Sequence, residues 1–163
     1  MSGLHVRLSQ KSKANGAPTL IFITGAALRV ADVTRILKDS KLRGDKGGDV
    51  AKLFARHFKL EEHIAYLKRT KVGAAVGTPG RIGKLLDVGE SNCIVFHWPL
   101  RFFFEGALSL SALSHIMLDV TFRDAKRRSL LDIPETRDEV FKVLGFPRLY
   151  EGIKQGTIQV VLF

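Results

Sequence analysis

Short apolar runs that alternate with amphipathic helical patterns constrain this fold more than any other feature of the sequence. The run from Thr19 to Thr24 has the unbroken apolar centre expected of a strand buried on both faces. Further strands are predicted at Val50–Ala55, Val72–Gly77, Ser114–Val120 and Thr157–Phe163, and helices from Ala26 to Leu37 and at Leu60–Lys68, Pro79–Leu86 and Glu135–Leu144. Strands that alternate with helices of these lengths predict an α/β fold, with a mostly parallel sheet and helices on both of its faces.

The composition fits one globular domain with a polyanionic partner. The chain has 163 residues and a formal net charge of +10, which favours nucleic acid first and an anionic membrane second. Its single cysteine, Cys93, excludes an internal disulfide, and a reducing cytosolic or nuclear compartment is expected. No apolar stretch approaches the length of a membrane-spanning helix. Residues 1–17 are predicted to form a flexible basic tail, and residues 18–163 the folded domain.

Ligands of parallel sheets bind beyond the carboxyl ends of the strands, so function is expected just after three predicted strands. These positions are Thr24–Gly25, Gly77–Arg81 and Asp119–Thr121. At the second of them, Gly77, Thr78, Pro79, Gly80 and Arg81 join a strand to a helix whose first turn has free backbone donors. With Arg81 and the nearby Lys84, this corner is predicted to bind phosphate. The alternative is that it is a structural strand-to-helix turn in basic surroundings.

The Thr-Pro-Gly-Arg run resembles the motif found in the first RecA-like domain of DEAD-box RNA helicases, where it grips the nucleic-acid backbone. Ile116–Thr121 resembles the strand that ends in Asp-Glu-Ala-Asp, with Asp119, Val120, Thr121 and Phe122 at the positions of the acidic motif. Val120 stands where the catalytic Glu is expected, so the group that orients the attacking water is absent. No phosphate-binding Gly-x-x-x-x-Gly-Lys-Ser/Thr occurs in the sequence. A pseudo-helicase without cofactor is therefore predicted.

A lone Asp119 is a poor magnesium site, and its more ordinary role is to cap the turn after the strand. The five histidines have no metal-ligand spacing, so no metal site is predicted. The densest basic cluster follows the degenerate acidic motif and consists of Arg123, Lys126, Arg127 and Arg128. This cluster is either a surface that contacts RNA phosphates or docks a protein, or a simple solvated face.

Several segments together resemble the Cms-one family, whose members are degenerate relatives of DEAD-box helicases. The segments that carry the resemblance are Gly77–Ile82, Asp119–Asp124, Leu131–Glu135 and Glu139–Phe141. The resemblance implies a nuclear, nucleolar protein of the small-subunit processome. It also implies a role in rRNA processing and ribosome biogenesis, with pre-rRNA and pre-ribosomal proteins as partners. Neither a membrane partner nor a small-molecule substrate is implied. The alternative functions are a protein-interaction module with an incidental basic surface and, least favoured, an active RNA-dependent ATPase.

The sequence departs from this family at two places. The chain starts almost at the domain, and no segment before Thr19 can supply the usual central strand, so the sheet is expected to be incomplete at its N-terminal end. Residues 88–104 hold the only Cys, the only Trp and four Phe residues in a stretch that the family lacks. We hypothesise a translated intron there, which transcript sequencing or peptide mass spectrometry can test. A loop that contacts a partner or a membrane is the alternative.

Overall fold

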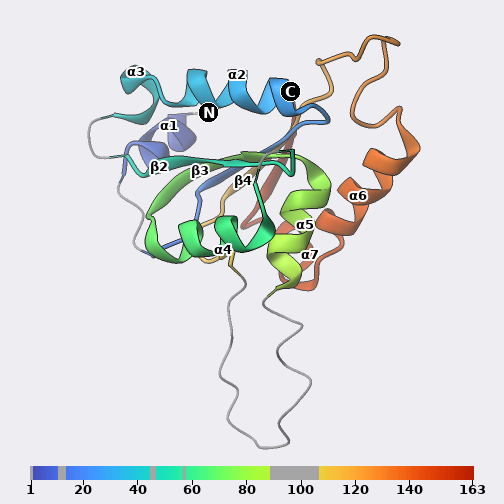
Figure 1. Cartoon of the computed structure of the whole chain (residues 1–163). Helices are drawn as coiled ribbons and strands as arrows, with labels where there is room; N and C mark the ends of the chain where they lie inside the picture. Colours follow the sequence, from blue (N-terminus) through green and yellow to red (C-terminus); the bar gives the residue numbers. More distant parts are fainter. Residues whose placement is uncertain (1, 11–13, 45–46, 57, 89–106) are drawn as a thin grey trace, which may run out of the picture.

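The computed structural model describes residues 2–10, 14–44, 47–56, 58–88 and 107–163, and these residues form a five-stranded parallel sheet covered by helices (Figure 1). The strands are β1 (Leu20–Ile23), β2 (Asp49–Leu53), β3 (Val72–Gly77), β4 (His115–Leu118) and β5 (Gln159–Leu162). Their order is β2-β3-β1-β4-β5. In the centre, Leu20 of β1 is in register with Ala74 of β3 on one side and His115 of β4 on the other.

Side chains that alternate along β1 divide the interior into two cores. Ile21 and Ile23 face the larger core, under α4 (Leu60–Arg69), α5 (Pro79–Asp87), α6 (Pro134–Leu144) and α7 (Pro147–Lys154). Leu20 and Phe22 face the smaller core, under α2 (Ala27–Leu37). Because successive strand residues point to opposite faces, one apolar run fills both cores. Figure 1 shows α2 on one face of the sheet and α4 on the other.

The predicted α/β class, with a parallel sheet and helices on both faces, is confirmed. All five predicted strands are present with slightly different ends, and so are the four predicted helices. The sequence predicted a sheet that lacks its usual central strand. Among the described residues no strand precedes β1, but the sheet is continuous, because β1 pairs with β3 on one side and with β4 on the other. Its two edges among the described residues are β2 and β5.

Three short helices were not predicted. The expected flexible tail instead contains α1 (Ser2–Leu8), because Leu4 and Leu8 pack against the smaller core. α3 (Ser40–Arg43) follows Asp39, whose side chain accepts a hydrogen bond from the Lys41 amide. α7 begins at Pro147, and its Leu149 is fully buried against the larger core.

No helix of the described part of the chain is long and apolar enough to cross a membrane. The predicted insertion at 88–104 lies almost entirely outside the described residues, apart from Val88 at the end of α5.

Candidate nucleic-acid interface

At the corner between β3 and α5, the backbone of Gly77 lies close to β2, as a glycine at this position suggests. A Cβ atom on Gly77 would collide with the carbonyl oxygen of Leu53 and would lie 3.1 Å from Ile82. The Thr78 amide donates to the same Leu53 carbonyl at 3.0 Å, and Pro79 then starts α5. The Thr78 side chain does not cap the helix. The sequence therefore predicted the strand-to-helix turn correctly, and close packing against β2 requires a glycine at position 77.

Arg81 does not project from this corner into solvent. Only 9% of the residue is exposed, and its Nη2 atom donates a hydrogen bond to the Phe58 carbonyl oxygen at 2.9 Å. Among the described residues, Nε and Nη1 of Arg81 have no hydrogen-bond partner. The guanidinium of Arg81 therefore links α5 to the segment before α4, a role that the motif alone did not indicate.

His63 of α4 lies close to Arg81 and shares its burial. The His63 ring is 4% exposed and its centroid is 5.3 Å from that of Phe58. Burial, and secondarily the positive charge of Arg81, lower the pKa of His63, while Glu62 opposes this shift. The imidazole is therefore held in its neutral form at physiological pH.

The start of α5 also has a carboxylate beside it. A Cβ atom on Gly80 would collide with the carboxylate of Glu139, which comes from α6. The first turn of a helix carries partial positive charge, so a carboxylate here is stabilising. The position where we expected a phosphate oxygen is thus close to an anion of the protein itself. Glu139 was missed because it lies 59 positions after Gly80 in the chain and only tertiary packing brings it there.

Asp119, at the end of β4, is a buried and fully paired carboxylate. It has no exposed surface, and its Oδ2 accepts a hydrogen bond from Arg29 Nε at 2.9 Å. Its Oδ1 accepts from the Thr121 hydroxyl at 2.9 Å and from the Phe122 amide at 3.2 Å. Burial raises the pKa of Asp119, but the hydrogen bonds from Arg29, Thr121 and Phe122 outweigh it and lower the pKa overall. This geometry is that of a turn cap, as the more ordinary interpretation of the sequence predicted.

Arg29 is a site residue that sequence reasoning missed. It lies in the first turn of α2, and its guanidinium carbon is 6.0 Å from the centroid of the Phe122 ring, in addition to its bond with Asp119. A usable signal was present, because Arg29 is the only cation between the end of β1 and Val30. A buried carboxylate at the same edge of the sheet requires such a partner.

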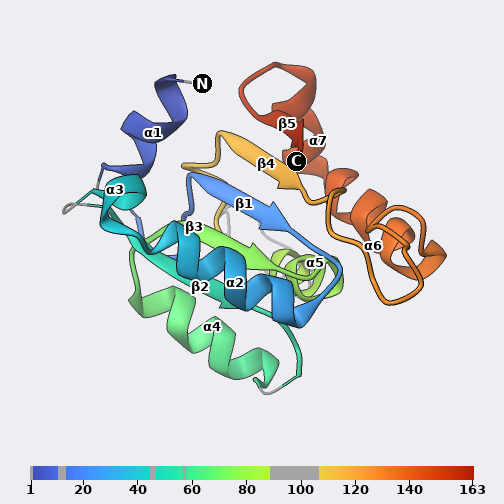
Figure 2. The same ribbon diagram turned by 90° about the horizontal axis from the view of Figure 1, so that it is seen from above.

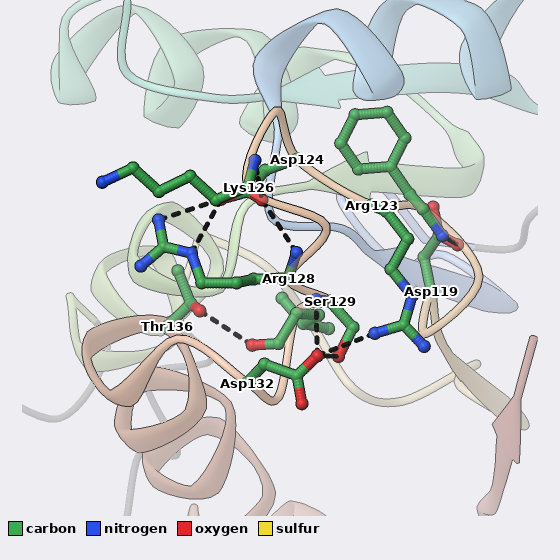
Figure 3. A network of polar contacts seen from close by, with 10 residues as sticks. Asp119, Arg123, Asp124, Lys126, Arg128, Ser129, Asp132 and Thr136 are labelled. Atoms are coloured by element: carbon green, nitrogen blue, oxygen red, sulfur yellow. Dashed lines mark hydrogen bonds and ion pairs between the residues drawn. The ribbon is translucent and has the colours of Figure 1, made fainter.

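The loop after Asp119 forms a well-bonded network of its own (Figure 3). Asp124 Oδ1 accepts from the backbone amides of Lys126 and Arg128 at 2.8 Å each, and its Oδ2 lies 2.9 Å from Arg128 Nη2. Arg123 Nη1 lies 2.7 Å from Asp132 Oδ2, and Asp132 also accepts from the amide and the hydroxyl of Ser129. Two of the four predicted basic residues, Arg123 and Arg128, are therefore ion-paired within the loop.

The other two, Lys126 and Arg127, are exposed and form no ion pair within the described part of the chain. The Lys126 side chain extends away from the network in Figure 3. Arg127 has a φ of 60°, a left-handed conformation that is uncommon for a residue with a side chain, so the turn fixes its backbone against its preference. The hydrogen bonds to Asp124 thus define a turn on which two adjacent cations, Lys126 and Arg127, are exposed and have no ion pair among the described residues.

The structure brings the predicted positions to one end of the sheet without joining them into a single surface. Gly80 contacts Glu139 of α6, and a Cβ atom on Gly25 would be 3.6 Å from Leu130 at the end of the basic loop. Lys84 is exposed on α5, whereas Arg81 is turned inward. Over the described residues, no group of three or more His, Cys, Asp or Glu side chains could hold a metal ion.

Comparisons with known proteins identify relatives of this chain. A family model described as CMS1, U3-containing 90S pre-ribosomal complex subunit, matches residues 1–97 and 100–163. Protein CMS1 of Chaetomium thermophilum is 37% identical over 139 residues, which are 85% of this chain and 47% of that protein. Protein CMSS1 of Homo sapiens is 33% identical, over 85% of this chain and 42% of that protein. Protein cms1 of Schizosaccharomyces pombe is 31% identical, over 95% of this chain and 48% of that protein.

The chain thus spans about half the length of the curated relatives it matches. Among solved structures, the yeast DEAD-box splicing factor Prp28 is similar with a TM-score of 0.48 and 16% sequence identity, over 98% of this chain and 29% of that chain.

Proposed function

The chain belongs to the CMS1 family, described as subunits of a U3-containing 90S pre-ribosomal complex, and on this basis we propose that it binds RNA in a pre-ribosomal particle without catalysing a reaction. The proposal includes a place in small-subunit ribosome biogenesis, with pre-rRNA and pre-ribosomal proteins as partners and a nuclear, nucleolar location. The net charge of +10 supports a polyanionic partner.

The observation that carries the RNA proposal is the pair of free cations at Lys126 and Arg127. Arg123 and Arg128 are ion-paired with carboxylates of the loop, whereas Lys126 and Arg127 stay exposed on a turn that Asp124 holds. Cations held on a fixed turn lose less conformational freedom when they contact phosphate. We therefore assign the main phosphate contacts to these two residues, with Lys84 and the Gly77–Arg81 corner as secondary positions.

A salt titration tests this assignment. Binding of the full chain to a labelled structured RNA is measured from low to high salt for the wild type and for a Lys126→Gln, Arg127→Gln double variant. Each lost phosphate contact reduces the slope of log affinity against log salt by about 0.7 to 0.9, so a reduction of about 1.5 is expected. The matched control is a Lys68→Gln, Arg69→Gln double variant, which removes two exposed charges at the end of α4. An equal effect of the two double variants would show that only net charge matters, and would overturn the assignment.

The absence of catalysis is tested on the same protein by measuring ATP hydrolysis with and without RNA. Asp119 is bonded to Arg29, Thr121 and Phe122, so its carboxylate is already committed within the fold. Turnover above background is not expected. RNA-stimulated hydrolysis that disappears in Asp119→Asn would contradict the non-catalytic part of the proposal.

A protein-interaction module is the second candidate function, and the apolar surface near the end of the chain favours it. Phe141 of α6 is 58% exposed, Tyr150 of α7 is 57% exposed, and Leu162 of β5 is 64% exposed. Exposed apolar and aromatic side chains of this size are enriched at protein contacts. Binding to pre-ribosomal proteins that persists at high salt, with no RNA affinity at low salt, would favour this function over RNA binding.

A further inference from the structure

A large cleft lies at the opposite end of the sheet from the basic loop. Its volume is about 1080 Å³, and it opens at the amino ends of β4 and β5. One wall is α1, and the others are the segment before β4 and the turn before β5. In Figure 2, α1 and the α7–β5 region lie on opposite sides of the start of β4. The cleft contains none of the residues assigned above to phosphate contacts, and an RNA ligand in it would rest on the proposed function.

Among the described residues, the lining of this cleft has hydrogen-bonding groups and positive charge but no carboxylate. Leu4 and Leu113 are among its apolar members, and its described polar side chains are those of Arg7, Gln10, Thr19, Ser111, Ser114, His115, Thr157 and Gln159. Arg7 and Gln10 are exposed, and Arg7 forms no ion pair within the described residues. In a protein that carries 16 Asp and Glu residues, a lining of this size without one acid is suited to an anionic ligand.

Hydrogen bonds connect the residues at the floor of the cleft. The Ser114 hydroxyl lies 2.8 Å from His115 Nδ1 and donates to the Thr19 carbonyl oxygen at 3.2 Å. Ser109 and Ser111 hydroxyls are 2.9 Å apart on the adjoining segment. Burial, then the charge of Arg7, lowers the pKa of His115, and a hydrogen bond with Gln159 opposes this shift. Arg7 and His115 both line the cleft, so the cleft offers an anion a guanidinium group and an imidazole ring.

From this arrangement we propose that the cleft binds a phosphorylated ribonucleotide unit, with Arg7 on its phosphate and the Gln159 and Ser111 side chains on its base or ribose. Guanidinium groups bind phosphate through charge-assisted hydrogen bonds. Amide and hydroxyl side chains bind base edges and the ribose hydroxyl, which is how proteins recognise single-stranded RNA. Leu4 and Leu113 offer apolar surface to the face of a base. The unit is either part of an RNA strand or a free nucleotide, and both have the same chemistry.

The cleft is located directly by photocrosslinking. The full chain is irradiated with single-stranded RNA that contains 4-thiouridine, and crosslinked peptides are identified by mass spectrometry. Crosslinks from the RNA are expected to fall on residues within the ranges 111–115 and 156–159. Crosslinks confined to residues 119–129 would overturn the cleft proposal while leaving the proposed function in place.

Matched variants then test the role of Arg7. Arg7→Gln is expected to weaken binding of a short single-stranded RNA about tenfold and to abolish the crosslinks in the cleft. Arg35→Gln is the control, because Arg35 is a comparably exposed arginine on α2 with only a 3.5 Å contact to Asp32. Equal affinities for the two variants would overturn the proposal. The Lys126→Gln, Arg127→Gln variant is expected to retain the cleft crosslinks. The experiment can therefore contradict the phosphate contacts assigned to the basic loop without contradicting the ribonucleotide site in the cleft, and the reverse.

Competition distinguishes the two sources of the nucleotide. Uridine and adenosine monophosphates are added to the crosslinking reaction at millimolar concentration. If they remove the cleft crosslinks in the wild type, the cleft accepts free nucleotides, and if only unlabelled RNA competes, the ligand is a strand. Either result supports a ribonucleotide site. Competition by inorganic phosphate alone to the same extent as by the nucleotides would overturn the assignment of Gln159 and Ser111 to the base or ribose.

Discussion

At the scale of single residues, Arg29 and Asp119 determine the stability of the carboxyl end of the sheet. Asp119 has no exposed surface, and only 25% of the Arg29 side chain is exposed. Removal of one partner from such a pair leaves an uncompensated buried charge. Arg29→Ala is expected to lower the free energy of unfolding by about 3 kcal/mol, as measured by urea denaturation. Adding Asp119→Asn to Arg29→Ala should recover part of that loss, and a further loss of similar size would contradict this explanation.

His63 makes the stability depend on pH. Its pKa in the folded protein is below the ordinary value of about 6.5, so the unfolded chain binds the proton more readily. The free energy of unfolding should therefore decrease as pH falls from 7.5 to 5.5. His63→Leu should show a smaller decrease over the same range in urea titrations. His115 also has a lowered pKa and contributes in the same direction in both proteins, so the difference between them isolates His63. Equal decreases in the two proteins would show that His63 has no such effect.

The roles of these residues differ in how far the sequence could predict them. The cap at Asp119 follows from one carboxylate at a strand end and was predicted. The inward orientation of Arg81 depends on the Phe58 carbonyl, 23 positions earlier, and the partner of Asp119 is 90 positions away. Contacts of this separation are created by the sheet topology, and no local pattern specifies them. The sequence predicted which residues stand at the strand ends, but it did not predict which distant residues form hydrogen bonds with them.

At the scale of elements, α5 and α6 meet through the contact between Gly80 and Glu139. Glu139→Gln removes a negative charge from the N-terminus of α5 and should lower the free energy of unfolding by about 0.5 kcal/mol. RNA affinity should rise, because a phosphate can then approach the first turn of α5 without repulsion. Asp138→Asn is the control, since it makes the same change of charge on α6 at an exposed position. If both variants bind RNA equally well, the β3–α5 corner does not contact RNA.

The elements themselves were largely predictable wherever local signals agreed. β3 and α5 were found because an apolar run of six buried residues is followed by Pro79 at a helix start. α1 was missed because its polar sequence indicates no helix until Leu4 and Leu8 are placed against α2 and β2. α7 could have been found, since Leu149 and Ile153 are spaced one turn apart after Pro147. Short helices of this kind depend on tertiary packing for their stability.

At the scale of the whole molecule, the two edges of the sheet differ in character. β2 has the exposed Lys52, whereas β5 has Val160 at 37% exposure and Leu162 at 64%. Charged side chains on an edge strand discourage pairing with another chain, and apolar ones permit it. Leu162→Lys should therefore reduce concentration-dependent association, as measured by sedimentation velocity. Lys52→Leu should have the opposite effect at the other edge. Association that is unchanged by Leu162→Lys would show that the β5 edge takes no part in it.

The position of β1 in the middle of the sheet has a consequence for the order in which the chain acquires its structure. β1, β2 and β3, with the helices between them, come from residues 20–77 and form one side of the sheet from a continuous stretch. β4 and β5 can join only after a much later part of the chain is available. During synthesis, the first three strands therefore leave the ribosome well before the fourth. Until β4 is available, one edge of β1 has no partner strand. A chaperone that acts on this nascent protein would be needed in that interval, and it would cover the unpaired backbone edge of β1.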